Sequence, residues 1–387
     1  MNWPDRIKNS AIIWVFPFIA LTLALFARET SHAARSALYL CLDVVIPSLF
    51  PFFVLSRLTV PFLKNLKCPK FIKILVEKLF GLPYYAIVIM VLGYLSGYPT
   101  GAKLARDMFD EGLIDNNQAS KIIAVANNSS PLFLVGTIGA GLFRSVKIGF
   151  FLLMVHWLSG IIAGFIILSL SGNNDLKDRK SRKGFFEQNL KTGENPHIFY
   201  MIPAAVEDAA ILSIKVSGYI ILFAVVSELL SRTGFFAAIG SFASLLMTGK
   251  PARNWINGLF SALFRGLLEI TTGAQAISRL DNCSLSIKLA LVSFICGFAG
   301  FSVHTQIMGI MKGTKARYSV LVCGKLLHGA LAFVLTLLIA KISPFTIQVS
   351  NAAVLSLTDF SGIRIVTVSV LILSLLFAPY RSEKTTG

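Results

Sequence analysis

The chain has 387 residues, of which 55% are apolar and 14% are charged, and its mean hydropathy is +0.72. These values exclude an ordinary soluble domain and indicate an integral membrane protein. The formal net charge of +17 indicates basic cytoplasmic loops and contact with membrane lipid, and we expect no nucleic-acid partner. The five cysteines form no CxxC motif and no Cys/His cluster, so we predict neither a disulfide framework nor a metal site.

Apolar runs along the chain predict about eight transmembrane helices. They are Ala11 to Ala27, Leu38 to Leu58, Ser120 to Leu142, Val146 to Leu170, Ala209 to Leu230, Leu285 to Val303, Ser319 to Ala340 and Ile363 to Ala378. The first run resembles a signal peptide, with a cleavage site at Ser31-His32-Ala33, but its length and the spans that follow favour a retained helix. Two shorter segments, Pro69 to Phe80 and Phe235 to Met247, are predicted to lie along the membrane interface.

The segment 81–112 contains GYPTG (Gly97 to Gly101) between an apolar arm and the shorter AKLARDMFDEG. The apolar arm has about 13 residues and would rise roughly 20 Å as a helix, less than a hydrocarbon core of about 30 Å. Two glycines and a proline disfavour a continuous helix, and Thr100 is placed to cap a new one. We predict a re-entrant helical hairpin whose tip borders a cavity. The alternative is a Pro-kinked transmembrane helix followed by a polar loop.

A second interrupted segment, Trp255 to about Leu280, breaks at ITTGA (Ile270 to Ala274) and predicts a second hairpin. Short matches relate the two halves: a shift of 172 pairs Gly101-Ala102-Lys103 with Gly273-Ala274-Gln275, and Ser130 with Ser302. We therefore expect an inverted repeat, an arrangement that commonly places a binding site near the bilayer midplane.

This interpretation divides the chain into five parts. They are an N-terminal transmembrane helix (1–36), a first repeat (37–170, with hairpin 81–112 and broken helix 117–142), a basic loop (171–203), a second repeat (204–341, with hairpin 254–283 and broken helix 284–305) and a C-terminal transmembrane helix with its tail (342–387). With both termini in the cytoplasm, the inner loops hold about twice as many basic residues as the outer ones, as the positive-inside rule requires. This count holds only if both interrupted segments return to the side from which they enter.

After each hairpin the sequence predicts a helix that breaks in mid-span. ANNSSPLF (Ala126 to Phe133) places Ser130 as an N-cap before a proline, and GFAGFSVHTQ (Gly297 to Gln306) is its counterpart. Helix starts after Thr100, after Ser130, after Thr272 and near Ser302 would turn backbone N–H groups toward a common cavity and favour an anion. The alternative is that the polar residues of the first break bind neighbouring helices.

Ionisable residues inside spans are costly and are therefore functional candidates. Lys103 follows the first hairpin tip by one turn, and Lys215 and Arg265 are further basic candidates, with an internal ion pair such as Arg265 with Glu269 as the alternative role. Asp43 and Glu228 are candidates for ion coupling. The predicted substrate site comprises Gly97, Tyr98, Pro99, Thr100, Gly101, Lys103, Asn127, Asn128, Ser129, Ser130, Glu269, Thr271, Thr272, Gly273, Gln275, Gly300, Ser302 and His304.

His156, His304 and His328 are far apart in the chain and match no metal-ligand spacing; His304, after the second break, is the one assigned to the site. The chain has no nucleophile elbow, Walker loop, HExxH motif or paired catalytic carboxylates. We therefore expect no enzymatic activity and no cofactor. The sequence predicts no particular oligomeric state.

Three blocks of sequence resemble a known family. They are GYPTGAKLARDMFDEGLI (Gly97 to Ile114), NNSSPLFLVGTIGAGLF (Asn127 to Phe143) and GFAGFSVHTQI (Gly297 to Ile307). On these blocks the chain resembles the sporulation integral membrane proteins of the YlbJ type, which carry the nucleoside-recognition or Gate domain. That domain is similar to the core of concentrative nucleoside transporters, in which paired hairpins and broken helices enclose the substrate. The resemblance covers most of the chain from about Pro47 to Ala340.

The resemblance implies a role in endospore formation and movement of dipicolinate, with calcium, across the outer forespore membrane. An all-helical anion transporter is therefore the leading hypothesis. A nucleoside-type transporter is an alternative, but Glu269 and Gln275 offer few partners to ribose hydroxyls. Another is a non-transporting scaffold for spore cortex or envelope assembly, which would recruit spore-envelope proteins through the basic loop 177–191. An intramembrane enzyme acting on an envelope precursor is the last, and no acid/base pair supports it.

Overall fold

The computed structural model describes residues 16–65, 69–74, 76–77, 80–170, 198–245, 250–281 and 283–342. Throughout these residues the regular secondary structure is helical. Among the described residues, five helices are long and apolar enough to cross a membrane: Ala27–Leu63, Val146–Leu170 (α8), Ile198–Arg232 (α10), Leu285–Ile310 and Tyr318–Ile342 (α16). The predicted class, an all-helical polytopic membrane protein, is confirmed.

The other three predicted crossings have different outcomes. The run Ala11 to Ala27 lies partly outside the described residues, which show a short apolar helix at Phe16–Leu25. The run Ser120 to Leu142 forms two shorter helices, as its predicted break requires. Ile363 to Ala378 lies outside the described residues, as does nearly all of the basic loop 171–203.

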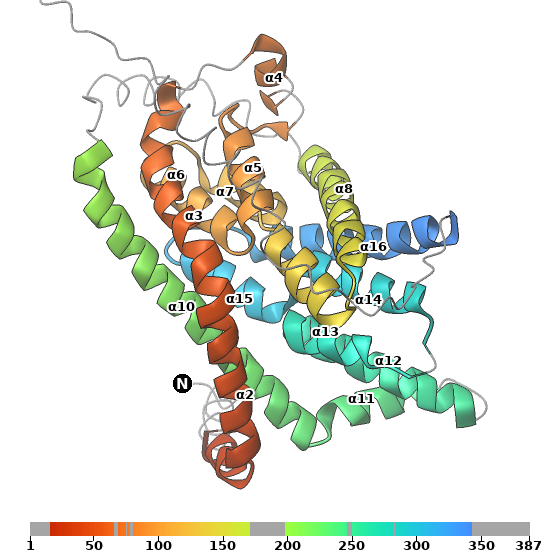
Figure 1. Cartoon of the computed structure of the whole chain (residues 1–387). Helices are drawn as coiled ribbons and strands as arrows, with labels where there is room; N and C mark the ends of the chain where they lie inside the picture. The colour runs from red at the N-terminus through yellow and green to blue at the C-terminus, as the bar shows by residue number, and fades with distance from the viewer. Residues whose placement is uncertain are drawn as a thin grey trace, which may run out of the picture. The chain divides into compact units, whose positions relative to one another are not determined.

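The first long helix is the continuous run of α2 (Ala27–Leu40), η1 (Cys41–Val45), α3 (Ile46–Thr59) and η2 (Val60–Asn65). Figure 1 shows this run, in red and orange, beside the green α10. Phe53 of α3 is fully buried, and it packs with Leu49 and with Ala209, Leu212 and Val216 of α10. This small core joins an element of the first half of the chain to one of the second.

Helix α8 shows which surface faces lipid. Its exposed large side chains are Phe150, Met154, Leu158, Ile161 and Phe165, which recur every three or four residues and so form one stripe. In an aqueous protein such a stripe would be covered, whereas in a bilayer the acyl chains solvate it. Small and polar residues of the opposite face, including Gly160 and Gly164, pack inward.

The first hairpin consists of α5 (Ala86–Ser96), a turn at 97–99 and α6 (Thr100–Asp110). A Cβ atom added at Gly93 or at Gly101 would lie 1.8 or 2.3 Å from the same carbonyl oxygen, that of Ala126. In a straight helix residues eight apart are separated by about 12 Å, so the chain must fold back on itself. The predicted hairpin is confirmed, and the alternative of a kinked transmembrane helix is excluded. Thr100 is not the N-cap: it is the first helical residue, and its buried Oγ1 atom has no hydrogen-bond partner in the described chain.

The second hairpin consists of α12 (Lys250–Leu268) and α13 (Ile270–Ser278). Gly266 and Gly273 bring the two arms together, because a Cβ added at Gly273 would lie 2.0 Å from the Gly266 Cα. The break is at Glu269, which is extended, and not within ITTGA, which forms the first turn of α13. The sequence prediction placed the break too late because glycine at 273 serves close packing rather than a turn.

Both predicted helix breaks are present. The first separates α7 (Asn116–Val125) from η4 (Leu132–Leu142), which has the wider π-helical spacing. The second separates α14 (Leu285–Phe298) from α15 (Gly300–Ile310) at Ala299, where φ is 77°. It therefore lies two to three residues before Ser302, which belongs to the first turn of α15.

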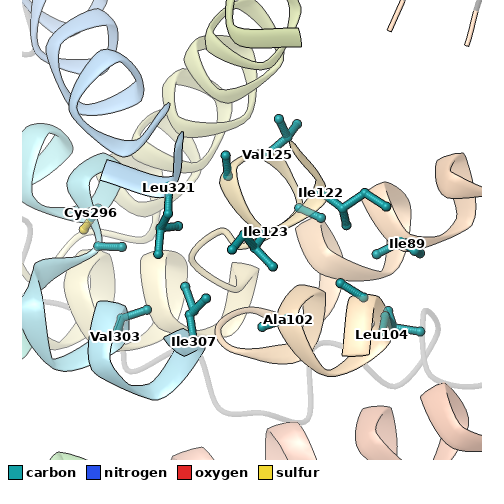
Figure 2. Close-up of a cluster of buried hydrophobic side chains, with 14 of the residues drawn as sticks. Ile89, Ala102, Leu104, Ile122, Ile123, Val125, Cys296, Val303, Ile307 and Leu321 are labelled. Atoms are coloured by element: carbon teal, nitrogen blue, oxygen red, sulfur yellow. The ribbon is translucent and has the colours of Figure 1, made fainter. Parts of the chain in front are cut away.

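The order of elements recurs along the chain: a long helix, a short helix, a hairpin, a broken helix and a long helix. The short helices are α4 (Lys70–Ile74) and α11 (Phe235–Ser244). Figure 2 shows the main core, in which Ile123 of the first half lies near Val303 and Ile307 of the second. The two halves therefore share one core rather than forming separate domains.

Polar contacts also join segments predicted to lie on the same side of the membrane. Arg106, at the base of the first hairpin, donates to the carbonyl oxygen of Lys312 at 2.5 Å. Asn116 accepts from the backbone of Lys315 at 2.7 Å, and Asn117 accepts from Arg317 at 2.6 Å. The first hairpin and the loop after α15 thus open to one face, which the positive-inside rule predicts to be cytoplasmic.

Candidate functional site

Both hairpin tips and both helix breaks border one cavity, which we call the central cavity. Its volume is about 100 Å³, enough for roughly three water molecules at the volume each occupies in the liquid. Of the predicted site, seven residues line it: Gly97, Tyr98, Ser129, Ser130, Glu269, Thr271 and Ser302. Ser48, Ser96 and Gln306 add polar groups, and apolar side chains of η1, α3 and α10 close the remaining wall. None of these additional lining residues was predicted from the sequence to belong to the site.

Tyr98 at the first hairpin tip ties the two halves together. Its hydroxyl donates to the carbonyl oxygen of Cys296 in α14 and accepts from the Ser129 hydroxyl at 3.0 Å. Gly97 before it has φ 94°, and an added Cβ would lie 2.8 Å from the Ser130 Cβ. The tip therefore requires glycine for both conformation and space.

Asn127 and Asn128 are completely buried but do not line the central cavity. The Asn127 side chain accepts from the Ala102 N–H at 2.9 Å and donates to the Ile123 carbonyl at 2.8 Å. The Asn128 amide donates to the Val125 carbonyl at 2.9 Å. These amides bind the first hairpin to α7 and satisfy the open backbone of the break, which is the alternative role weighed for them above.

Glu269 is the one carboxylate among the described residues that line the central cavity. It caps α13, accepting from the backbone N–H groups of Thr271 at 3.0 Å and Thr272 at 2.7 Å. The ion pair with Arg265, which was the alternative role for these two residues, is absent, because Arg265 donates to Ser231 and lies 5.3 Å from the Phe236 ring centroid. The positive end of the α13 dipole is therefore already neutralised by the protein.

The four helix starts predicted to donate to an anion are thus not equivalent. Ala102 N–H of α6 binds Asn127, and Phe133 N–H of η4 binds the Ser130 hydroxyl at 3.2 Å. Helix α15 has no side-chain cap at its start. Ser302 in its first turn and Gln306 one turn later line the central cavity, so α15 offers the least compensated helix N-terminus.

Lys103, predicted to contact substrate, lies elsewhere. It pairs with Asp107 at 2.6 Å, and both side chains are largely buried. They line a second cavity of about 880 Å³, which we call the charged cavity. Residues four apart in a helix lie on the same face, one turn from each other, so the Lys103 ammonium group can pair with the Asp107 carboxylate.

The charged cavity also contains ion pairs between Arg57 and Asp208 at 3.4 Å and between Arg106 and Asp110 at 2.8 Å. Lys215, Lys312 and Glu111 complete its charged lining. Val216 and Gln306 line both cavities. The charged cavity is therefore adjacent to the central one, on the face that carries the first hairpin's base.

The remaining predicted site residues shape the scaffold. Gly101, Gly273 and Gly300 permit close helix contacts, and Pro99 follows Tyr98 in the turn through a cis peptide bond. Thr272 lies 3.3 Å from Ser227, His304 is bound to the Phe298 carbonyl at 2.8 Å, and Gln275 is exposed. Neither candidate for ion coupling lines a described cavity: Asp43 is exposed, and Glu228 pairs with Arg232 at 2.7 Å.

Sequence reasoning missed a buried group behind the first break. Lys325 of α16 donates to the Asn127 carbonyl, and the rings of His156 and His328 lie 4.5 Å apart, centroid to centroid. The signals were available: Lys325 interrupts an apolar run, and the histidines are separated by 172 residues, the shift that relates the repeats. Among the described residues no group of three or more His, Cys, Asp or Glu side chains is arranged to hold a metal ion.

These features define a polytopic helical membrane protein in which two hairpins and two broken helices border a central cavity. No protein-family model matches the chain, and no solved structure matches it. The chain is 29% identical over 352 residues to the sporulation integral membrane protein YlbJ of Bacillus subtilis (strain 168), which covers 87% of this chain and 84% of that protein. The resemblance to the YlbJ-type family is confirmed, and the chain is a homologue of these sporulation integral membrane proteins.

Proposed function

We propose that the protein is a membrane transporter for a small organic anion during sporulation, with dipicolinate, accompanied by calcium, as the substrate and the outer forespore membrane as its location. The observation that carries this proposal is the central cavity. Both hairpin tips and both helix breaks border it, and broken helices around a midplane site are the usual architecture of secondary transporters.

The preference for an anion rests on the helix ends and on the approach to the site. The uncapped start of α15 presents the positive end of a helix dipole next to Ser302. The adjoining charged cavity holds five basic side chains, Arg57, Lys103, Arg106, Lys215 and Lys312, against four acidic ones. This cavity would gather a dicarboxylate, and Gln306, shared by the two cavities, would pass it on.

Uptake of labelled dipicolinate by the purified protein in liposomes tests the proposal, with and without calcium. Replacing Ser302 by Val fills part of the central cavity and removes a hydroxyl, so we expect uptake to fall at least about tenfold. Thr305→Val is the matched control, because Thr305 lies on the exposed side of the same helix; its uptake should stay within about twofold. Equal uptake by both variants would contradict the assigned site, and no uptake by the wild type would contradict transport.

A nucleoside-type substrate is the second candidate, and one observation favours it. Glu269 and Gln306 both line the central cavity, and a carboxylate and an amide are suitable partners for ribose hydroxyls. Gln275, the amide expected in this role, is exposed and does not line the cavity. Unlabelled uridine or adenosine added to the dipicolinate assay distinguishes the two candidates, because only a nucleoside site would show competition at comparable concentrations.

A further inference from the structure

The middle of α16 carries a lysine that is entirely inside the protein. Lys325 has no exposed surface. Its ammonium group donates to the Asn127 carbonyl and lies 3.4 Å from the Asn128 side-chain oxygen. The Tyr98 ring centroid is 5.8 Å away. No carboxylate of the described chain forms an ion pair with it.

Such a residue is costly, since a charged lysine at the centre of a span opposes insertion of the helix into the membrane. Two oxygen acceptors and an aromatic face offset part of this cost. A lysine amine that has lost its proton can still donate to the Asn127 carbonyl, so both protonation states fit the same contacts. Arginine would lack this property because its guanidinium remains charged.

The position of the ammonium group is informative. Helix α7 ends at Val125 with Ala126 as its C-cap, and the negative end of its dipole points toward the Asn127 carbonyl. In transporters with broken helices, half-helix C-termini and unwound carbonyls are where a coupling sodium ion or proton binds. Here the Lys325 ammonium occupies that place at the first break.

The hydrogen bonds of the two histidines near Lys325 fit neutral rings. The titratable side chains of α16 and of the elements around it include Lys121 of α7, His156 of α8, Cys296 of α14, His304 of α15, His328 of α16, Tyr94 of α5 and Tyr98 of the turn. The Ser129 N–H donates to His156 Nε2 at 3.0 Å, which requires that nitrogen to be unprotonated. His328 Nε2 faces the His156 carbonyl at 3.0 Å and serves as a donor in the neutral ring.

We infer that Lys325 is a cation built into the first break, and that it binds and releases the coupling proton in place of a sodium ion. The inference rests on the proposed transport function and specifies its energy source. On release an N–H bond of the ammonium breaks, its electron pair stays on Nζ, and the proton passes to water entering from the central cavity. Tyr98, which lines that cavity and lies against Lys325, is the side chain that must move to admit it.

The test uses the full-length protein in liposomes that enclose a pH-sensitive dye, with labelled dipicolinate outside. Dipicolinate should drive proton movement in the wild type, and uptake should be unchanged when potassium replaces all sodium. Lys325→Arg keeps the charge but cannot release the proton, and Lys325→Met removes it. Both should lose substrate-driven proton movement at least about tenfold, while Lys325→Arg retains exchange of internal for external substrate. Lys341→Met, at the exposed end of the same helix, is the control.

The outcomes separate the two proposals. Wild-type uptake without proton movement, or uptake that requires sodium, overturns the role of Lys325 and leaves transport intact. Full proton movement in Lys325→Arg also overturns it, and this variant decides the matter if Lys325→Met does not fold. Absence of any uptake by the wild type overturns the transport function and this inference with it.

Discussion

The contact between the first hairpin and the first break can be tested at Gly93. This residue lies in the middle of α5, and an added Cβ would be 1.8 Å from the Ala126 carbonyl oxygen and 2.9 Å from its carbon. Real Cβ atoms essentially never approach closer than 3.0 Å. Because the neighbour is backbone, no side-chain rotation can relieve the clash. The hairpin must move away from α7 by roughly 1.2 Å.

The expected cost follows from two opposing terms. Overpacking a core costs typically about 1–3 kcal/mol, and contact with backbone puts Gly93→Ala at the upper end. Alanine in place of glycine in a helix returns about 1 kcal/mol. The variant should therefore be less stable by about 2 kcal/mol. A displaced hairpin would also carry the Gly97 tip away from the central cavity, so we expect dipicolinate uptake to fall along with stability.

Thermal unfolding in detergent and uptake in liposomes measure these two effects. Gly258→Ala is the matched control: it lies in α12, and its added Cβ would meet the flexible end of Leu280 at an ordinary 3.4 Å. That variant should be as stable as the wild type or more stable by up to about 1 kcal/mol. If Gly93→Ala has the stability and uptake of Gly258→Ala, the hairpin does not pack against the first break as described here.

Further predictions concern the charged groups. Lys103→Ala leaves Asp107 buried without its ion-pair partner and should destabilise the protein by about 3 kcal/mol. The double variant Lys103→Ala with Asp107→Ala should be destabilised less, because it leaves no unpaired buried charge. Denaturation measures both, and equal losses of stability in the two variants would contradict the ion pair. Glu269→Ala removes both capping bonds of α13 and should cost about 1–2 kcal/mol by the same measurement, with Glu269→Gln in between. Gln306→Leu should lower the rate of uptake without lowering stability, since it lies where the two cavities meet; an unchanged rate would separate the charged cavity from the pathway.

The hairpins and breaks were predictable because glycine and proline act locally. The glycine and proline of GYPTG disfavour a continuous helix, so the chain turns there. Irregular backbone inside a bilayer must be buried by protein or line a cavity, and both hairpin tips therefore lie at the central cavity. The positions within the second half were less accurate. Glu269 begins α13 through its side chain rather than through glycine, and Ala299 adopts φ 77° at the second break, a conformation that its sequence does not indicate.

Side-chain destinations were harder to predict, since they depend on packing between distant elements. The spacing of Lys103 and Asp107 is visible in the sequence, but the choice between that pair and the hairpin tip depends on where α6 lies against α3 and α10. Lys325 could have been identified as an ionisable residue in a span. Its partner at Asn127 could not, because 198 residues separate them.

The repeats are alike in order but differ in charge, and this difference bears on the substrate. A shift of 172 pairs Gly97 with Glu269 and Asn127 with Ala299. Glu269 neutralises the positive end of α13, and Lys325 neutralises the negative end of α7. Each ionic group thus compensates one helix end at the centre of the protein. The start of α15 has no such compensating group, and it lines the central cavity through Ser302. The positive end of this helix dipole therefore lacks a negative partner within the protein, and an anionic substrate would supply one.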